Sequence, residues 1–199
     1  MNRFMILSLC AVMCMACKAQ NISLPQPQTT GGKPLMEALK DRQSTREFSD
    51  KELDEQTLSD LLWAAYGFNR EDKRTAPSAN NRQEFIIYAV LKSGVYFYDA
   101  KANELILKAE GDFRSAIGKQ DFVTVAPLNL VFVADLTKNS AEGAASDVGF
   151  ISQNVYLYCA SAGLGTVVRG WFDKADVKTA LQLSETEEPV LTQTVGYKK

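Results

Sequence analysis

Four strand-like runs in the middle of the chain constrain its fold more than any other feature. The run nearest the C-terminus is apolar and rich in β-branched residues, as in a strand buried on both faces. Residues 99–103 form a hairpin-like connection between the second and third runs. The four runs cover Glu84 to Leu91, Val95 to Tyr98, Glu104 to Ala109 and Leu128 to Ala134.

Helical patterns flank these runs on both sides in the sequence. Apolar residues recur at three- and four-residue spacing through residues 54–68 and 141–162, which predicts two amphipathic helices. A short helix is expected from Pro34, and Asp173 is a good N-cap for a helix through Leu181. Two further strands are expected at 165–171 and 188–197. The pattern predicts an α+β fold with one mixed, mainly antiparallel central sheet flanked by helices.

The N-terminus carries the features of an export signal. Arg3 is followed by an apolar run that is too short to cross a bilayer, so residues 1–19 are predicted to be a signal peptide. Acylation at Cys17, as in a lipoprotein, and ordinary cleavage before Gln20 are both compatible with the sequence. Residues 20–33 are predicted to be a linker and residues 34–199 the folded domain. We therefore expect an exported protein, periplasmic or anchored by lipid in a bacterial envelope.

Composition excludes several classes of function. The chain has 24 acidic and 22 basic residues, a net charge of −2, and no histidine. A balanced charge argues against a nucleic-acid partner, which needs a basic surface. Without histidine there is no Ser-His-Asp triad and no His-ligated metal site, and no metal site is expected. If the chain is an enzyme, a bound cofactor is expected to supply the chemistry.

A short basic segment is the first candidate site. Arg42, Ser44 and Arg46 alternate, so in an extended backbone they face the same side. Two guanidinium groups with a hydroxyl between them suit a phosphate monoester. Taken alone, the same residues are equally expected in a solvated turn, where the arginines pair with Asp41 or other nearby carboxylates.

A polar segment ahead of the first strand run, residues 77–83, is the second candidate. Its Asn and Gln amides can donate to and accept from the edge of a planar heterocycle. Ser78 and Ala79 are small enough to let the backbone approach a ligand closely. Taken alone, this segment is also typical of an ordinary polar loop.

Together, and in this order, the two segments resemble the nitroreductase family of flavoproteins. That family has an N-terminal Arg-x-Ser-x-Arg and a later Pro-Ser-x-x-Asn-x-Gln, which Arg42–Arg46 and Pro77–Gln83 match. Residues 96–112 are similar to the branch of thiazoline- and oxazoline-forming dehydrogenases. Further matching segments follow in the expected order: Asp147-Val148-Gly149, Gln153-Asn154, Gly163-Leu164-Gly165, Arg169-Gly170-Trp171-Phe172-Asp173 and Val195-Gly196-Tyr197.

The resemblance implies FMN held at a homodimer interface, with both subunits lining each site. Arg42, Gln43, Ser44 and Arg46 would contact the phosphate and ribityl chain. The segment from Pro77, with Ser78, Ala79, Asn81 and Gln83, would lie near the ribityl chain and the ring, with one group coming from the partner subunit. Backbone N–H groups at Arg169 and Gly170 would face the reactive edge of the flavin.

The implied activity is an FMN-dependent oxidoreductase reaction with no side-chain nucleophile. Hydride would pass from NAD(P)H or another reductant through flavin N5 to an electron-poor acceptor, such as a nitro compound or quinone. The alternative is a non-catalytic relative, which keeps the fold in the cell envelope as a binding or accessory protein.

Overall fold

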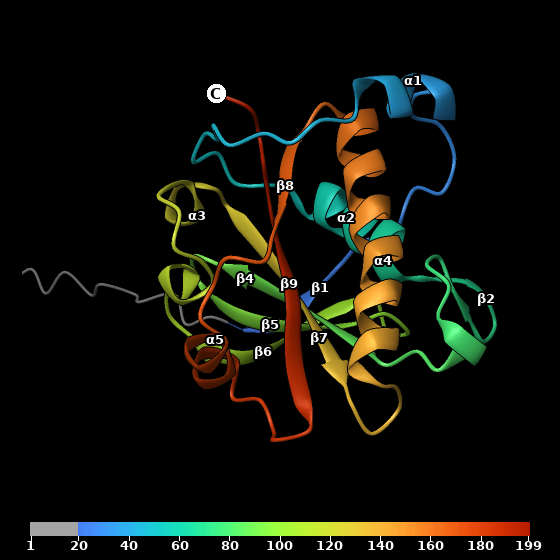
Figure 1. Cartoon of the computed structure of the whole chain (residues 1–199). Helices are drawn as coiled ribbons and strands as arrows, with labels where there is room; N and C mark the ends of the chain where they lie inside the picture. The colour runs from blue at the N-terminus through green and yellow to red at the C-terminus, as the bar shows by residue number, and fades with distance from the viewer. Residues whose placement is uncertain (1–19) are drawn as a thin grey trace, which may run out of the picture.

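A seven-stranded antiparallel sheet forms the centre of the molecule (Figure 1). The computed structural model describes residues 20–199, so the predicted signal peptide and Cys17 lie outside the described residues. The strand order is β1-β6-β5-β4-β7-β9-β8, and every pair is antiparallel. The predicted α+β class is confirmed. The strands of the sheet are β1 (Ile22–Ser23), β4 (Phe85–Leu91), β5 (Gly94–Asp99), β6 (Glu104–Glu110), β7 (Leu128–Asp135), β8 (Gly165–Arg169) and β9 (Glu187–Gly196).

The helices begin and end close to where the sequence predicts them. The side chain of Asp54 caps α2 by accepting from the Thr57 N–H, and Asp173 caps α5 in the same way. Gly163, with φ of 75°, ends α4 in the left-handed conformation that glycine favours. The helices are α1 (Leu35–Asp41), α2 (Glu55–Tyr66), α3 (Phe122–Val125), α4 (Ala141–Ala162) and α5 (Lys174–Leu181), with 3-10 turns η1 (Ala79–Asn81) and η2 (Arg114–Ala116).

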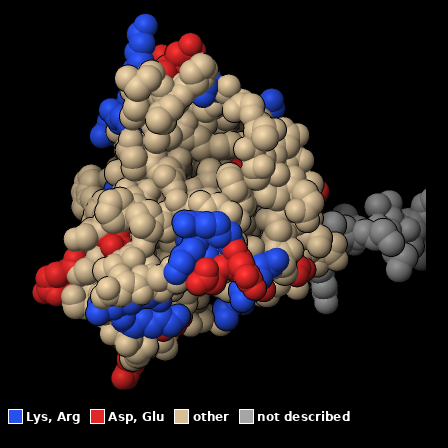
Figure 2. Space-filling view, turned by 90° about the vertical axis from the view of Figure 1, so that its right-hand side faces the viewer, with Lys and Arg blue, Asp and Glu red and all other residues tan. Residues whose placement is uncertain are grey.

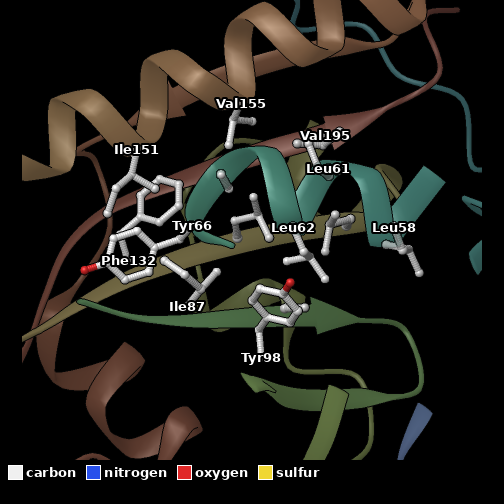
Figure 3. Close-up of a cluster of buried hydrophobic side chains, with 14 of the residues drawn as sticks. Leu58, Leu61, Leu62, Tyr66, Ile87, Tyr98, Phe132, Ile151, Val155 and Val195 are labelled. Carbon is white, nitrogen blue, oxygen red and sulfur yellow. The ribbon is translucent and has the colours of Figure 1, made fainter. Parts of the chain in front are cut away.

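Helices cover both faces of the sheet because side chains alternate along each strand. In β4, Ile87 and Ala89 join the core under α2 and α4, whereas Tyr88 and Val90 face α5. Figure 3 shows α2 lying between α4 and the sheet, with the side chain of Leu62 directed from α2 toward the sheet. Burial on both faces explains why the β7 run is apolar throughout.

The predicted linker differs from the structure, because part of it belongs to the sheet. Ile22 and Ser23 form β1 on the β6 edge, and Leu24 is buried in the main core. The carbonyl of Pro25 accepts hydrogen bonds from Ser59 Oγ and Asn103 Nδ2. The backbone of residues 22–25 thus finds hydrogen-bond partners on β6 and in the side chains of Ser59 and Asn103. None of the helices within residues 20–199 is long and apolar enough to cross a membrane.

The residues between α2 and β4 also carry local structure. Residues Phe68–Arg70 (β2) and Lys73–Arg74 (β3) form a small separate hairpin, and η1 follows. The guanidinium carbon of Arg74 lies 3.9 Å from the centre of the Phe68 ring, which closes the hairpin. Strands of two and three residues are too short to show the alternation that predicts a strand.

Candidate functional site

The Arg42–Arg46 segment lies along β8, the edge strand of the sheet. The Thr45 N–H donates to the carbonyl of Thr166 at 2.9 Å. Gly165 is required beside this contact, because a Cβ there would lie 2.9 Å from Thr45 Cγ2 and 3.2 Å from Lys198 Cγ. Farther along, Phe48 pairs with Lys198 in an isolated antiparallel bridge. The segment therefore lies extended beside β8 and near the lysine that follows β9.

Tyr156 of α4 brings two of the predicted phosphate residues together. Its hydroxyl lies 2.8 Å from Ser44 Oγ, and its ring centre lies 5.2 Å from the guanidinium carbon of Arg42. The same hydroxyl accepts a hydrogen bond from the Val168 N–H at 3.1 Å, which connects the segment to β8. Sequence reasoning missed Tyr156, because a buried tyrosine on a long apolar helix is usually a core residue.

The arginines of this segment have no carboxylate partners. Neither Arg42 nor Arg46 forms an ion pair with any residue from 20 to 199, and Arg46 is exposed. Asp41, a candidate partner in the solvated-turn interpretation, instead pairs with Lys33 at 2.7 Å, and this hydrogen bond lowers the pKa of the Asp41 carboxyl. The segment thus offers two guanidinium groups and the Ser44 hydroxyl without an ion-paired carboxylate in residues 20–199. This donor set fits a phosphate group. Gln43, also predicted here, is exposed.

The Pro77–Gln83 segment uses most of its polar side chains internally. The Gln83 N–H donates to Ser78 Oγ, and Gln83 Nε2 donates to the Asp72 carbonyl at 2.7 Å and to Asn81 Oδ1 at 3.1 Å. Gln83 Oε1 in turn accepts from Arg74 Nε at 2.9 Å. Positive φ values at Asn80, Asn81 and Gln83 produce the tight loop. The exposed residues of the segment are Pro77, Ala79, Asn80, Asn81 and Arg82.

A buried polar cluster fixes this loop to the sheet and to α4. Asp147 Oδ2 accepts from the Ala79 N–H at 2.9 Å and from Asn139 Nδ2 at 3.3 Å. Asn139 Nδ2 also donates to Glu84 Oε1 at 3.0 Å, and Arg82 donates to Asn139 Oδ1. The sequence is equally compatible with a helix-dipole role and a substrate role for Asp147. Apart from Glu142, however, it is the one charged residue on α4, and that isolation is a signal for a buried acid.

Arg169 and Gly170 lie where β8 ends. The Arg169 guanidinium is buried and donates to Asn129, Thr194 and the Ile117 carbonyl, all of them neutral groups. Burial lowers its pKa to about 10. The side chain thus belongs to the interior of the domain, and Gly170 is exposed beyond it. Trp171, which follows in the same matching segment, is 67% exposed and is not a core residue.

A single chain does not bring the two predicted segments together. The first contacts α4 at Tyr156 and the second contacts it at Asp147, nine residues earlier. Nine residues correspond to about 13.5 Å along a helix and about half a turn around it. Figure 1 shows the chain after α1 near the C-terminal end of α4, and the β2 hairpin toward its other end.

Comparison with known proteins identifies the family. The model of the nitroreductase family matches residues 39–197. The chain belongs to the nitroreductase family. A curated relative from Methanocaldococcus jannaschii, whose name assigns it to the nitroreductases, is 32% identical over 182 residues, which cover 82% of this chain and 91% of the relative.

Solved structures of nitroreductase-family proteins share the fold. A structure from Ralstonia eutropha, described as that of a nitroreductase, is 44% identical, covers 91% of this chain and 90% of its own, and gives a TM-score of 0.84. An FMN-dependent nitroreductase from Clostridium difficile is 20% identical with a TM-score of 0.61, over 82% of this chain and 87% of its own, and shows the likeness of fold alone. Membership of the family confirms the predicted class, an FMN-dependent oxidoreductase. The similarity of residues 96–112 to thiazoline-forming dehydrogenases stays a prediction.

Proposed function

We propose that this nitroreductase-family protein transfers hydride from NAD(P)H to an electron-poor acceptor, such as a nitro compound or quinone, with FMN as its cofactor. The observation that carries the proposal is the cluster formed by Arg42, Ser44, Arg46 and Lys198. Within residues 20–199 its two arginines form no ion pair, and the segment lies beside the edge strand β8. Cations left without an acid are free to bind a phosphate group of the cofactor.

The chain's own residues would bind and orient the cofactor. Arg42 and Arg46 would donate to the phosphate, and Tyr156 would hold Ser44 in position through their hydroxyl contact. Backbone N–H groups at the end of β8, around Gly170, would stabilise negative charge on the ring. Bound FMN would supply the hydride chemistry, which is consistent with a sequence that has no histidine.

A homodimer would complete each site. Outside its first turn, α4 carries no exposed charged residue, since Asp147 is buried. Phe150 of α4 and Leu35, Met36 and Leu39 of α1 are exposed apolar side chains. Figure 2 shows this side of the molecule, where a broad area lacks charged side chains. A surface of this kind is typical of a protein contact. A second copy packed here would supply the Pro77–Gln83 loop that is distant from Arg42 within one chain.

The export signal supports a location in the bacterial envelope. If Cys17 is acylated, the mature protein is a membrane-anchored lipoprotein; if cleavage precedes Gln20, it is periplasmic. The mass of the mature protein distinguishes the two, because lipidation adds acyl chains to a chain that begins at residue 17. An unprocessed N-terminus in the host would contradict export.

Cofactor binding tests the proposal directly. The purified protein is expected to be yellow, to bind one FMN per chain, and to lose the flavin absorbance bands when NADPH or dithionite is added. The Arg42→Ala, Arg46→Ala double variant is expected to lose the flavin while keeping its fold. A colourless protein that does not take up added FMN would contradict the proposal and favour a non-catalytic relative.

A further inference from the structure

A cavity lies between the β2–β3 hairpin and strands β4 and β5. Its volume is about 310 Å³, within the lower range of small-molecule sites. It shares only Gln83 with the predicted flavin residues. Its lining includes five aromatic residues: Tyr66, Phe68, Phe85, Phe97 and Tyr98.

Arg74 gives this cavity a cation without a counter-ion. Its guanidinium carbon lies 3.9 Å from the centre of the Phe68 ring and 4.6 Å from that of Tyr66, so two rings sandwich it. Its Nε donates to Gln83 Oε1 and its Nη1 donates to the Tyr66 carbonyl, and both acceptors are neutral. Arg74 forms no ion pair within the described part of the chain. Three of the five guanidinium N–H groups remain without a protein partner.

The lining carries other charged residues besides Arg74. Lys101 and Lys138 line the cavity, and Asp99 is the one acid among the lining residues. Asp99 Oδ1 already accepts from the backbone N–H groups of Lys101 and Ala102, at 2.9 and 3.1 Å. Lys138 is exposed and forms an ion pair with Asp135 at 3.6 Å. Arg74 and Lys101 are therefore the two cations of the lining that have no ion-pair partner within residues 20–199.

We propose that this cavity binds a small aromatic carboxylate. The carboxylate would accept from the free N–H groups of Arg74, in the two-point geometry that guanidinium favours. The aromatic part would pack against the rings of Phe68 and Tyr98. A neutral aromatic molecule would leave the Arg74 donors unpaired, so the site selects for the charge as well as for the ring.

Binding of 2-naphthoate to the FMN-saturated protein, measured by isothermal titration calorimetry, tests this site. We expect one naphthoate per chain and at least tenfold weaker binding of 2-naphthalenemethanol, which has the ring system without the charge. Arg74→Gln is expected to weaken naphthoate binding tenfold or more. Lys101→Gln, at the exposed rim, is expected to weaken it severalfold without affecting folding. Lys108→Gln, an exposed lysine on β6, is the matched control and is expected to bind as the wild type does.

The same titrations can overturn the proposal. Equal affinity for naphthoate and the alcohol would mean that Arg74 does not receive a carboxylate. Wild-type affinity in a folded Arg74→Gln protein and in Lys101→Gln would place the ligand elsewhere. Loss of naphthoate binding in Arg42→Ala, Arg46→Ala would assign it to the flavin site. Because Lys101 is exposed, its variant keeps the test decisive even if Arg74→Gln impairs folding.

Discussion

The two predicted cofactor segments contact α4 nine residues apart, at Tyr156 and Asp147, and the structure holds them in different ways. Arg42 and Arg46 extend from a segment that is held by a few contacts, and their charges are unpaired. In the Pro77–Gln83 loop, by contrast, hydrogen bonds within the protein occupy the polar side chains, and Asp147 anchors the loop from α4. We infer that the Arg42–Arg46 segment contributes binding groups, whereas the Pro77–Gln83 loop contributes a rigid shape. Changes in the Arg42–Arg46 segment should therefore lower the affinity for FMN, and changes in the Pro77–Gln83 loop should lower the free energy of unfolding.

The largest effect is expected from removing both arginines. Arg42→Ala with Arg46→Ala would delete the two charge-assisted contacts that we propose to the phosphate, each worth about 1.5–3 kcal/mol. FMN affinity, measured by fluorescence quenching, should fall at least about a hundredfold. The free energy of unfolding of the FMN-free protein should change by less than about 0.5 kcal/mol, because neither arginine has an ion-pair partner. Arg70→Ala, an exposed arginine on β2, serves as the control. Unchanged FMN affinity would remove the phosphate assignment.

Loss of the buried anchor should destabilise the protein. Asp147→Ala leaves the Ala79 N–H without its acceptor and removes one partner of Asn139 inside the domain, and we expect a cost of about 3 kcal/mol in urea unfolding. Ser146→Ala, one residue earlier and exposed, should change stability by less than about 0.5 kcal/mol. Equal stability of the two variants would show that the loop does not depend on Asp147.

A smaller effect on both properties is expected at Tyr156. Tyr156→Phe removes the hydroxyl that contacts Ser44 and accepts from the Val168 N–H, at an expected cost of about 1 kcal/mol in stability. FMN affinity should fall severalfold, because Ser44 loses its support. Tyr158→Phe is the matched control, since the Tyr158 hydroxyl has only a 3.4 Å contact with the Thr57 carbonyl. A larger loss in Tyr158→Phe than in Tyr156→Phe would contradict this role.

The smallest response is expected from the Cys159 thiol, which is buried in the core on α4. Burial raises the pKa of Cys159, because the thiolate is the less favoured form away from water. The thiol therefore stays protonated at pH 8 and should react with an aromatic disulfide reagent only after unfolding. The difference in reagent uptake between the wild type and a Cys159→Ser variant gives the reaction of this thiol alone. Rapid reaction of Cys159 in the native protein would show that α4 opens readily.

Most of the fold could be predicted because its long elements carry periodic patterns. Helix α4 spans the predicted residues, and the β7 run is apolar because both of its faces are covered. Strand β1 and the β2–β3 hairpin were missed, because two or three residues are too few to show a period. At the site, the spacing of Arg42, Ser44 and Arg46 was visible in the sequence. The roles of Tyr156 and Asp147 were not, because they depend on tertiary contacts with residues 112 and 68 positions away.

We propose that each cofactor site combines the Arg42–Arg46 segment of one chain with the Pro77–Gln83 loop of another. Mixed dimers test it most directly. One partner carries Arg42→Ala and Arg46→Ala; the other carries Ala79→Trp, which fills the exposed space above the loop. Each variant alone should bind no FMN, whereas a dimer containing one of each has one site with both segments intact. We predict one FMN per mixed dimer, half the content of the wild type. A mixed dimer without FMN would show that each site is built from a single chain.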